Sequence, residues 1–193
     1  LDVTFAGAEA NVASSLALLG AQADFVTALP DGPLTDACLG SLRSVGVGVD
    51  DIRVTERGRF GIYFVEMGAN QRPSRVTYDR EYSAISQATA DDFDWDIIVG
   101  GGAWLHITGI TPALSRTAAE TTLFAARSAR ERGVTVSCDV NFRSKLWRWD
   151  NTRTPAQLAG DTLKQLLPFV DVLMASEEDF RLVGVTAPEI EKN

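Results

Sequence analysis

Several features are scarce in this sequence, and each scarcity excludes a class of protein. No apolar run reaches the roughly 20 residues needed to cross a bilayer, and the first residues do not form a charged-then-apolar leader. The two cysteines, Cys38 and Cys138, lie far apart in apolar segments, and the single histidine, His106, is distant from both. This distribution argues against a disulfide and against a zinc site. We therefore expect a cytoplasmic protein without a membrane partner.

Basic residues are outnumbered as well. The chain has 18 Lys and Arg against 26 Asp and Glu, a net charge of −8, which disfavours a nucleic-acid-binding surface. The cations nevertheless gather in two places: Arg72, Arg75 and Arg80, and then Arg143, Lys145 and Arg148. Local positive charge on an acidic protein suits a small anionic ligand.

The most informative stretch runs from residue 134 to residue 147. Its first half alternates Val134, Val136, Cys138 and Val140 with small residues, which predicts a buried strand. Its second half crowds polar and charged side chains: Asp139, Asn141, Arg143 and Lys145. Ligands of open parallel sheets bind beyond the carboxyl ends of strands, so a site is expected here. From spacing alone, a strand followed by a solvated loop is an equally good interpretation.

Strands and helices alternate over most of the chain, which predicts an α/β fold with a mostly parallel sheet. The predicted strands cover residues 1–5, 23–29, 104–108, 134–140 and 170–175, and the predicted helices cover 12–19, 34–45, 114–132 and 154–167. The last helix has a particularly clear start, with Thr154 as N-cap, Pro155 at the first position and Gln157 at the third. Ser176 is readable as the N-cap of one more helix.

One region breaks the alternation. Residues 52–55, 60–67 and 75–80 read as three short strands without a helix between them, which predicts a meander. Tyr78 and Arg80 are two residues apart and therefore share one face of a strand. His106 lies within an apolar strand, and we interpret it as structural. The run Gly100–Gly102 lacks the spacing of a phosphate-binding loop, so we interpret it as a connection.

Five stretches, in order, resemble ribokinase-like sugar kinases, and most of all the branch that phosphorylates 2-keto-3-deoxygluconate. They are AGAEAN from Ala6, the Tyr63 segment with Tyr-Asp-Arg from Tyr78, SAIS from Ser83, LHITGI from Leu105, and DVNFR with Leu146-Trp147. The resemblance covers nearly the whole chain. It implies a three-layer ribokinase-like fold whose α/β core comprises residues 1–51 and 81–193, with residues 52–80 as a small β-sheet lid.

The resemblance also implies roles for individual residues. The sugar acid would be bound by Gly7, Tyr63, Tyr78, Asp79, Arg80, Ile110 and Arg143. ATP and its phosphates would meet Asn141, Phe142, Arg143, Ser176 and Asp179, with Mg²⁺ held by no direct protein ligand. Arg143 would also neutralise charge in the transition state, and the lid would offer a homodimer surface.

The chain departs from the family pattern at several points. Ala6 stands where the family has a glycine, and Ser176 and Asp179 stand where it has Asn and Glu. The family's catalytic Asp belongs to a Gly-Ala-Gly-Asp segment, and no Gly-x-Gly-Asp occurs here. We therefore expect no catalytic residue within this chain, a sequence truncated relative to the family, and no kinase activity from it alone. A kinase for a neutral sugar such as fructose or ribose, and a non-catalytic sugar-acid-binding fragment, remain as alternatives.

Overall fold

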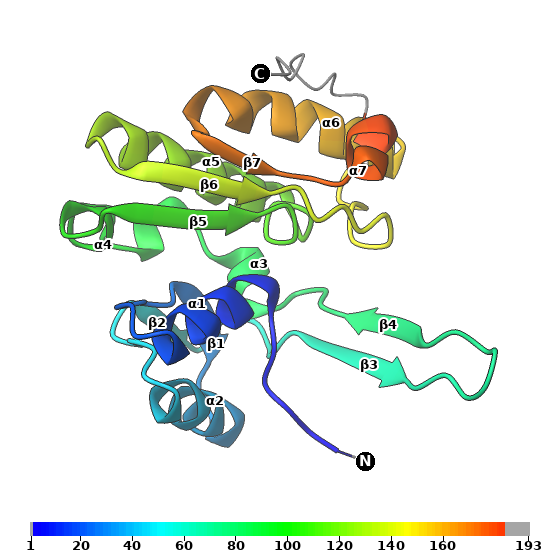
Figure 1. The fold of residues 1–193 in the computed structure, drawn as a ribbon, viewed down its shortest axis with the longest axis horizontal. Helices are drawn as coiled ribbons and strands as arrows, with labels where there is room; N and C mark the ends of the chain where they lie inside the picture. Colours follow the sequence, from blue (N-terminus) through cyan, green and yellow to red (C-terminus); the bar gives the residue numbers. More distant parts are fainter. Residues whose placement is uncertain (1, 184–193) are drawn as a thin grey trace. The chain divides into compact units, whose positions relative to one another are not determined.

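The computed structural model describes residues 2–183 (Figure 1). The chain divides into two compact units, Leu1–Ala88 and Thr89–Asn193. Each unit has its own parallel strand pairing, as the alternation of strands and helices predicted. Among the residues that the structure describes, no helix is both long and apolar enough to cross a membrane.

The first unit consists of a helix, a β-α-β arrangement, a hairpin and a short final helix. Its elements are α1 (Ala8–Leu18), β1 (Thr27–Pro30), α2 (Pro33–Ser44), β2 (Ile52–Thr55), β3 (Ile62–Glu66), β4 (Arg75–Asp79) and α3 (Ala84–Gln87). Strands β1 and β2 pair in parallel, from Thr27 opposite Ile52 to Pro30 opposite Thr55, and α2 connects them. The predicted strand over residues 1–5 is wrong, because residues 2–7 have no regular structure. Extended backbone forms a strand only where a neighbour takes its hydrogen bonds.

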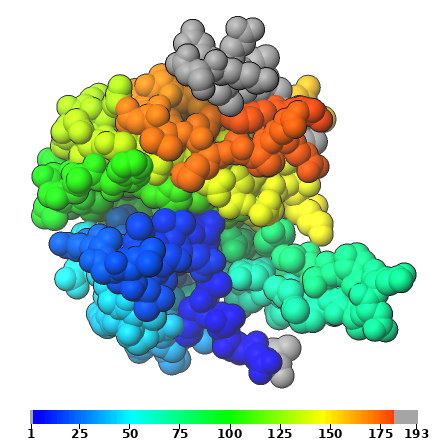
Figure 2. All heavy atoms as spheres, viewed as in Figure 1, coloured from blue at the N-terminus to red at the C-terminus, as the bar shows by residue number. Residues whose placement is uncertain are grey.

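The predicted three-stranded meander is also wrong at its first strand. The strand β2 belongs to the parallel pair with β1, while only β3 and β4 form an antiparallel hairpin. The physical reason is burial: Ile52 is 8% exposed and packs into the core of the first unit, whereas β3 and β4 are largely exposed. Figure 2 shows this hairpin, in teal, standing clear of the rest of its unit.

The core of the first unit lies between its two longer helices and β2. It is formed by Ala13, Cys38, Leu42, Val47, Val49 and Ile52. Burial raises the pKa of the Cys38 thiol above its ordinary value, so the thiol stays protonated. Both Cys38 and Cys138 are buried, as predicted.

The second unit is built on a three-stranded parallel sheet with the order β5-β6-β7. Its elements are η1 (Ala90–Asp92), α4 (Trp95–Gly100), β5 (Trp104–Thr108), α5 (Arg116–Glu131), β6 (Thr135–Asp139), α6 (Pro155–Leu166), η2 (Leu167–Phe169), β7 (Val172–Met174) and α7 (Glu177–Val183). Val136 and Cys138 of β6 are almost completely buried. Alanines 118, 119, 125, 126 and 129 give α5 a short-chain buried face, which lets the helix approach its neighbours closely.

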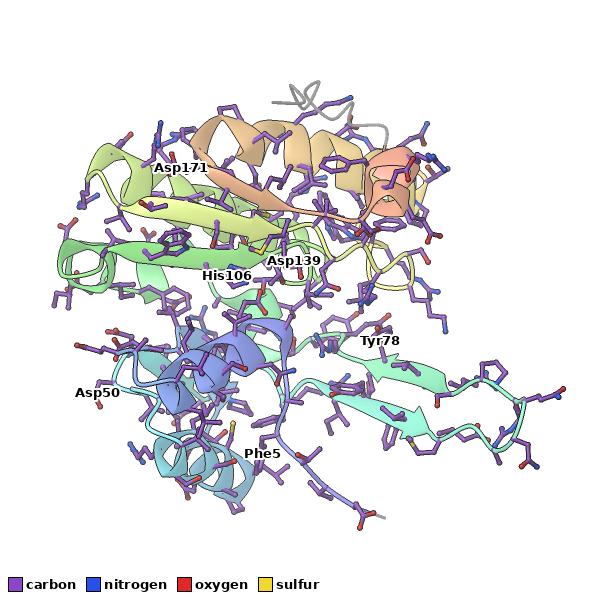
Figure 3. The ribbon with its side chains drawn as sticks, in the orientation of Figure 1. Phe5, Asp50, Tyr78, His106, Asp139 and Asp171 are labelled. Carbon is purple, nitrogen blue, oxygen red and sulfur yellow. The ribbon has the colours of Figure 1, made fainter. Side chains whose placement is uncertain are left out.

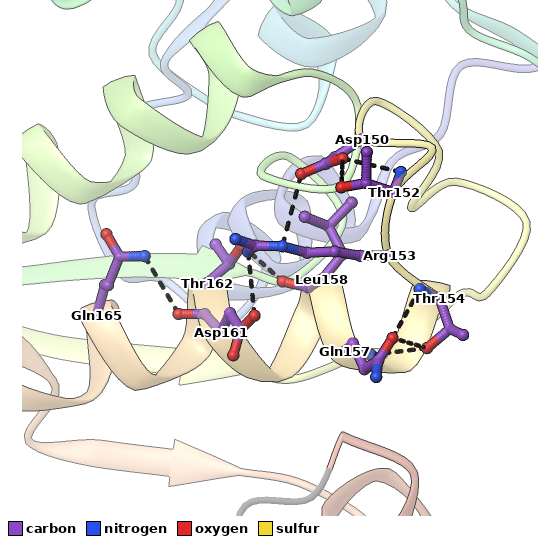
Figure 4. Close-up of polar contacts among 9 residues, drawn as sticks. All are labelled: Asp150, Thr152, Arg153, Thr154, Gln157, Leu158, Asp161, Thr162 and Gln165. Atoms are coloured by element: carbon purple, nitrogen blue, oxygen red, sulfur yellow. Dashed lines mark hydrogen bonds and ion pairs between the residues drawn. The ribbon is translucent and has the colours of Figure 1, made fainter.

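The predicted start of α6 is confirmed (Figure 4). The Thr154 hydroxyl accepts a hydrogen bond from the Gln157 N–H at 3.3 Å, and the Gln157 side-chain oxygen accepts one from the Thr154 N–H at 3.0 Å. The loop before it is closed by Asp150, which accepts from the hydroxyl and N–H of Thr152. These hydrogen bonds hold the pKa of Asp150 below its ordinary value. Helix α6 therefore starts at a sharply defined residue.

Candidate active site

The hairpin β3–β4 brings three predicted sugar-binding side chains onto one face, which we call the tyrosine face: Tyr63, Tyr78 and Arg80. Tyr63 lies directly opposite Tyr78 in the antiparallel register, and their ring centroids are 6.4 Å apart. The guanidinium carbon of Arg80 lies 5.4 Å from the centroid of the Tyr63 ring and 5.6 Å from that of Tyr78. Both distances are within the range of a cation–π contact.

The charge of Arg80 is not neutralised by the protein around it. Among residues 2–183, Arg80 forms no ion pair, and the hydroxyls of Tyr63 and Tyr78 have no hydrogen-bond partner. Arg80 is half-buried, so its guanidinium is partly withdrawn from water. Phenol hydroxyls and a planar guanidinium are groups that bind carboxylates in proteins, and a carboxylate-binding role for this face stays a prediction.

Asp79 lies on the opposite face of the hairpin. Its carboxylate forms an ion pair with the guanidinium of Arg59, whose Nε also donates to the Glu81 carbonyl at 2.8 Å. Backbone hydrogen bonds add to this connection, from the Arg59 N–H to the Tyr82 carbonyl at 3.1 Å and from the Ala84 N–H to the Arg59 carbonyl at 2.9 Å. Arg59 therefore fastens the hairpin base next to Arg80, a role that the sequence did not indicate. A substrate contact for Asp79 stays a prediction.

Gly7 is the N-cap of α1, with extended backbone at φ −177°. A Cβ placed on Gly7 would meet only the Ala10 Cβ, at an ordinary 3.7 Å. Within the described residues, packing therefore does not explain a glycine here. A close approach of ligand to the backbone, as the resemblance implies, explains it better.

In the second unit, the predicted residues at the end of β6 lie in a constrained loop. Asn141 has a positive φ of 39°, in the left-handed region that non-glycine residues rarely adopt. Its side-chain amide donates to Asp139 at 3.2 Å. Arg143 is exposed, and its guanidinium donates to the carbonyl of Phe142 at 3.0 Å. Within residues 2–183, most of the five N–H donors of this guanidinium therefore have no protein acceptor.

The ends of β5 and β7 adjoin this loop within the same unit. Gly109 follows β5 and donates its N–H to the Asp139 carbonyl at 2.8 Å, and a Cβ at Gly109 would lie 2.1 Å from the carbonyl oxygen of Val140. Only glycine fits there. The sequence did not lead us to predict this requirement, although a glycine directly after a strand often indicates a close approach of another backbone segment. The predicted pocket residue Ile110 follows and is buried.

At the end of β7, Ser176 caps α7 and is paired with Asp179. The Asp179 N–H donates to the Ser176 hydroxyl at 3.1 Å, while the Ser176 N–H and hydroxyl donate to Asp179 Oδ2 at 3.0 and 2.8 Å. The capping role, which the sequence analysis left open, is confirmed. Asp179 Oδ1 also accepts from the N–H of Phe142 at 3.4 Å. The structure thus brings together Phe142, Ser176 and Asp179.

His106 lies on β5 (Figure 3), in register with Ser137 of β6. Its Nδ1 lies 2.9 Å from the hydroxyl oxygen of Ser137, which also accepts from the Trp104 indole at 2.7 Å. The Nε2 atom is buried without a partner among the described residues. A ring held in this way by a buried serine supports the structural interpretation of His106.

Comparison with known proteins agrees with this geometry. The model of the pfkB family carbohydrate kinases matches residues 1–192. The chain belongs to this family. It is 40% identical over 183 residues to the 2-dehydro-3-deoxygalactonokinase of Haloferax volcanii, covering 95% of this chain and 55% of that protein. The chain spans about half the length of the curated relatives it matches.

Solved pfkB-type kinases share the fold. The 2-dehydro-3-deoxygluconokinase of Thermotoga maritima superposes with a TM-score of 0.88 at 47% identity, over 97% of this chain and 55% of that one. Fructokinase from Xylella fastidiosa with bound ATP gives a TM-score of 0.80 at 27% identity, over 93% and 52%. The predicted α/β ribokinase-like fold and the resemblance to the keto-deoxy sugar-acid branch are confirmed. The roles of the individual site residues stay predictions.

Proposed function

We propose that this chain carries the sugar-acid-binding part of an ATP-dependent kinase for a 2-keto-3-deoxy sugar acid. The reaction transfers the γ-phosphoryl group of ATP to the primary hydroxyl of the sugar acid and releases ADP. The observation that carries the proposal is the tyrosine face, where the Arg80 guanidinium lies over two tyrosine rings and has no acidic partner among residues 2–183. The names of the relatives, 2-dehydro-3-deoxygalactonokinase and 2-dehydro-3-deoxygluconokinase, support the same substrate class.

In this proposal, the carboxylate of the sugar acid and the phosphates of ATP are each bound by an arginine. The carboxylate binds the guanidinium of Arg80 through charge-assisted hydrogen bonds, and the Tyr63 and Tyr78 hydroxyls donate to oxygens of the substrate. In the first unit, Gly7 contacts the sugar and Asp79 adds a backbone or side-chain contact. In the second unit, Ile110 is the proposed sugar contact. Arg143, with Asn141 and Phe142, faces the phosphates of ATP. A fork-shaped cation that never loses its charge suits the developing charge of phosphoryl transfer.

Such kinases use ATP with Mg²⁺, so the residues predicted near the phosphates are relevant to the metal. Among residues 2–183, no cluster of three or more His, Cys, Asp or Glu could hold a metal ion. The carboxylate of Asp179 is already engaged by Phe142 and Ser176, and that of Glu177 pairs with Arg181. The described residues do not fit a protein-held magnesium ion, and the metal would reach the site with the nucleotide phosphates.

The hairpin also supports a homodimer. On its exposed surface, Phe64 is 51% exposed, Val65 48% and Met67 74%. Large apolar side chains exposed on a hairpin are typical of an interaction surface, and we propose that a second copy of the chain buries them. Sedimentation of the full-length protein would test this, and a Phe64→Asp variant should shift a dimer to monomer. A cytoplasmic location, where ATP is supplied, completes the proposal.

Two assays test the function together. Calorimetry on the 193-residue chain should show binding of 2-keto-3-deoxygluconate or its galactonate epimer and weak or no binding of fructose. Coupled ADP release should show no turnover by this chain alone, because a positioned base contributes about 10²–10⁴-fold to proton removal and we assign that base to no residue here. A full-length kinase carrying this sequence should turn over the sugar acid. Preferential turnover of fructose would favour the neutral-sugar alternative, and turnover by the 193-residue chain would show that the base is within it.

A further inference from the structure

We propose that Asp179 is a positioning residue that holds the loop following β6 against the start of α7, and that it does not order magnesium. The inference rests on the proposed kinase function. The family pattern has a Glu at this place with the magnesium role, so the assignment differs from what the resemblance implies. It is carried by the partners of the two carboxylate oxygens.

The carboxylate of Asp179 is occupied by protein donors. Oδ2 accepts from the N–H and the hydroxyl of Ser176, at 3.0 and 2.8 Å. Oδ1 accepts from the N–H of Phe142 at 3.4 Å. A carboxylate has about four lone-pair positions, so these donors leave about one for anything else. Mg²⁺ demands near-ideal octahedral geometry from its ligands, and a carboxylate already held by three protein donors is not free to turn towards the ion or its waters.

The bond to Phe142 connects two loops that are distant in sequence. The backbone of β6 makes its last hydrogen bond to β7 from the Val140 N–H to the Met174 carbonyl, at 2.8 Å. Beyond that point the chain leaves the sheet, and the next described anchor between the two loops is Asp179 on Phe142, 37 residues away. The bond therefore sets where the residues after Val140 lie.

The loop has a reason to need an anchor. Asn141 is held at φ 39°, in the left-handed region, which is unfavourable for a residue other than glycine. Such a conformation persists only when its surroundings hold it from several sides. Here the Asn141 side chain is tied to Asp139 at 3.2 Å, and the following N–H is tied to Asp179. Loss of the hydrogen bond between Asp179 and the Phe142 N–H lets the backbone relax just before Arg143. The proposed function places Arg143 at the ATP phosphates.

Four variants separate positioning from metal ordering. Asp179→Ala removes every acceptor. Asp179→Asn keeps one amide oxygen for the Phe142 N–H but removes the charge. Ser176→Ala removes the cap hydroxyl and leaves the bond to Phe142, and Glu178→Gln removes one exposed negative charge in the same turn, away from these contacts. All four are made in a full-length kinase that carries this sequence.

The first readout is hydrogen exchange at the Phe142 amide, without nucleotide or metal. Loss of one hydrogen bond of 0.5–1.5 kcal/mol predicts about 2- to 10-fold faster exchange in Asp179→Ala. Asp179→Asn, Ser176→Ala and Glu178→Gln should stay near the parent rate. Unchanged exchange in a folded Asp179→Ala protein would overturn the anchor. If that protein does not fold, exchange in Asp179→Asn as fast as that of an unprotected amide would overturn it.

The second readout is turnover as a function of free Mg²⁺. The proposal predicts that kcat falls in Asp179→Ala while KM for the sugar acid and the half-saturating Mg²⁺ concentration stay within about twofold. Asp179→Asn should keep the parent's half-saturating Mg²⁺ concentration, as should Glu178→Gln. A rise of about tenfold or more in the Mg²⁺ requirement of Asp179→Asn, with turnover restored by excess metal, would show that Asp179 orders the ion. Exchange is read without substrate, so a kinase inactive on sugar acids would refute the proposed function alone.

Discussion

Replacing Arg80 by alanine is the most direct perturbation of the tyrosine face. The guanidinium is half-buried between the rings of Tyr63 and Tyr78, with no acidic partner among the described residues. A hydrogen bond to a charged group contributes about 1.5–3 kcal/mol. At 1.4 kcal/mol per tenfold in affinity, Arg80→Ala should therefore raise Kd for 2-keto-3-deoxygluconate about 10- to 150-fold.

Matched variants isolate the carboxylate contact. Arg75→Ala removes an arginine from the same strand but from the opposite face, where Arg75 lies opposite Glu66 and is exposed. It should change Kd by less than about twofold, because exposed charges contribute little. Arg80→Lys keeps the charge but loses the planar fork that stacks on the rings, so its Kd should be intermediate.

Isothermal titration calorimetry on each variant, with fructose as a neutral ligand, tests whether Arg80 binds the carboxylate of the sugar acid. Any fructose binding should be nearly unaffected by Arg80→Ala, because fructose has no carboxylate. Equal losses for the two sugars would refute the carboxylate assignment, as would an equal effect of Arg75→Ala. The unfolding temperature of each variant shows whether the hairpin survives, since Arg80→Ala also removes two cation–π contacts of about 0.5–1 kcal/mol each.

Three further predictions follow from particular residues. Hydrogen exchange over residues 56–80 should slow when the sugar acid is added, because lid closure removes backbone from water; unchanged exchange at saturating ligand would mean that the hairpin is a fixed part of its unit. Gly109→Ala should destabilise the second unit by about 1–3 kcal/mol in urea unfolding, since the new Cβ would lie 2.1 Å from the Val140 carbonyl oxygen; parent-like stability would contradict this contact. The pKa of Asp171 is held below its ordinary value, first by the Val136 N–H, so its stabilisation is present above the unfolded value of about 3.9 and is lost as pH falls through the lower folded value. Asp171→Ala should therefore lower the unfolding midpoint at pH 7 and converge with the parent at low pH, and a constant difference across pH would argue against this linkage.

Sequence patterns predicted helix starts and strand faces well, because these features depend on interactions between residues that are close in sequence. The capping residues Thr154 and Gln157 mark the start of α6, because a cap involves only neighbouring groups. The two-residue period put Tyr78 and Arg80 on one face, and the register of the hairpin added Tyr63 to that face. The alternation of strands and helices likewise indicated parallel pairing, which both units show.

Contacts between distant segments could not be read in this way. Residues 52–55 look like any short strand, and only the burial of Ile52 beside β1 shows that they extend the parallel pair instead of the hairpin. The ion pair between Asp79 and Arg59, twenty residues earlier, was likewise not readable from the sequence. Sequence spacing carries no information on which of several charged side chains meet across a fold.

The sequence by itself determined the family, the alternation of strands and helices in the α/β parts, and the shared face of Tyr78 and Arg80. These depend on periodicity, caps and short motifs, which act over a few residues. Only the tertiary structure decided that Gly109 must be glycine, that Asn141 is left-handed, and that Asp179 binds the Phe142 amide. Each of these depends on a backbone group brought close by the parallel sheet, whose neighbouring strands are separated by a whole helix in sequence.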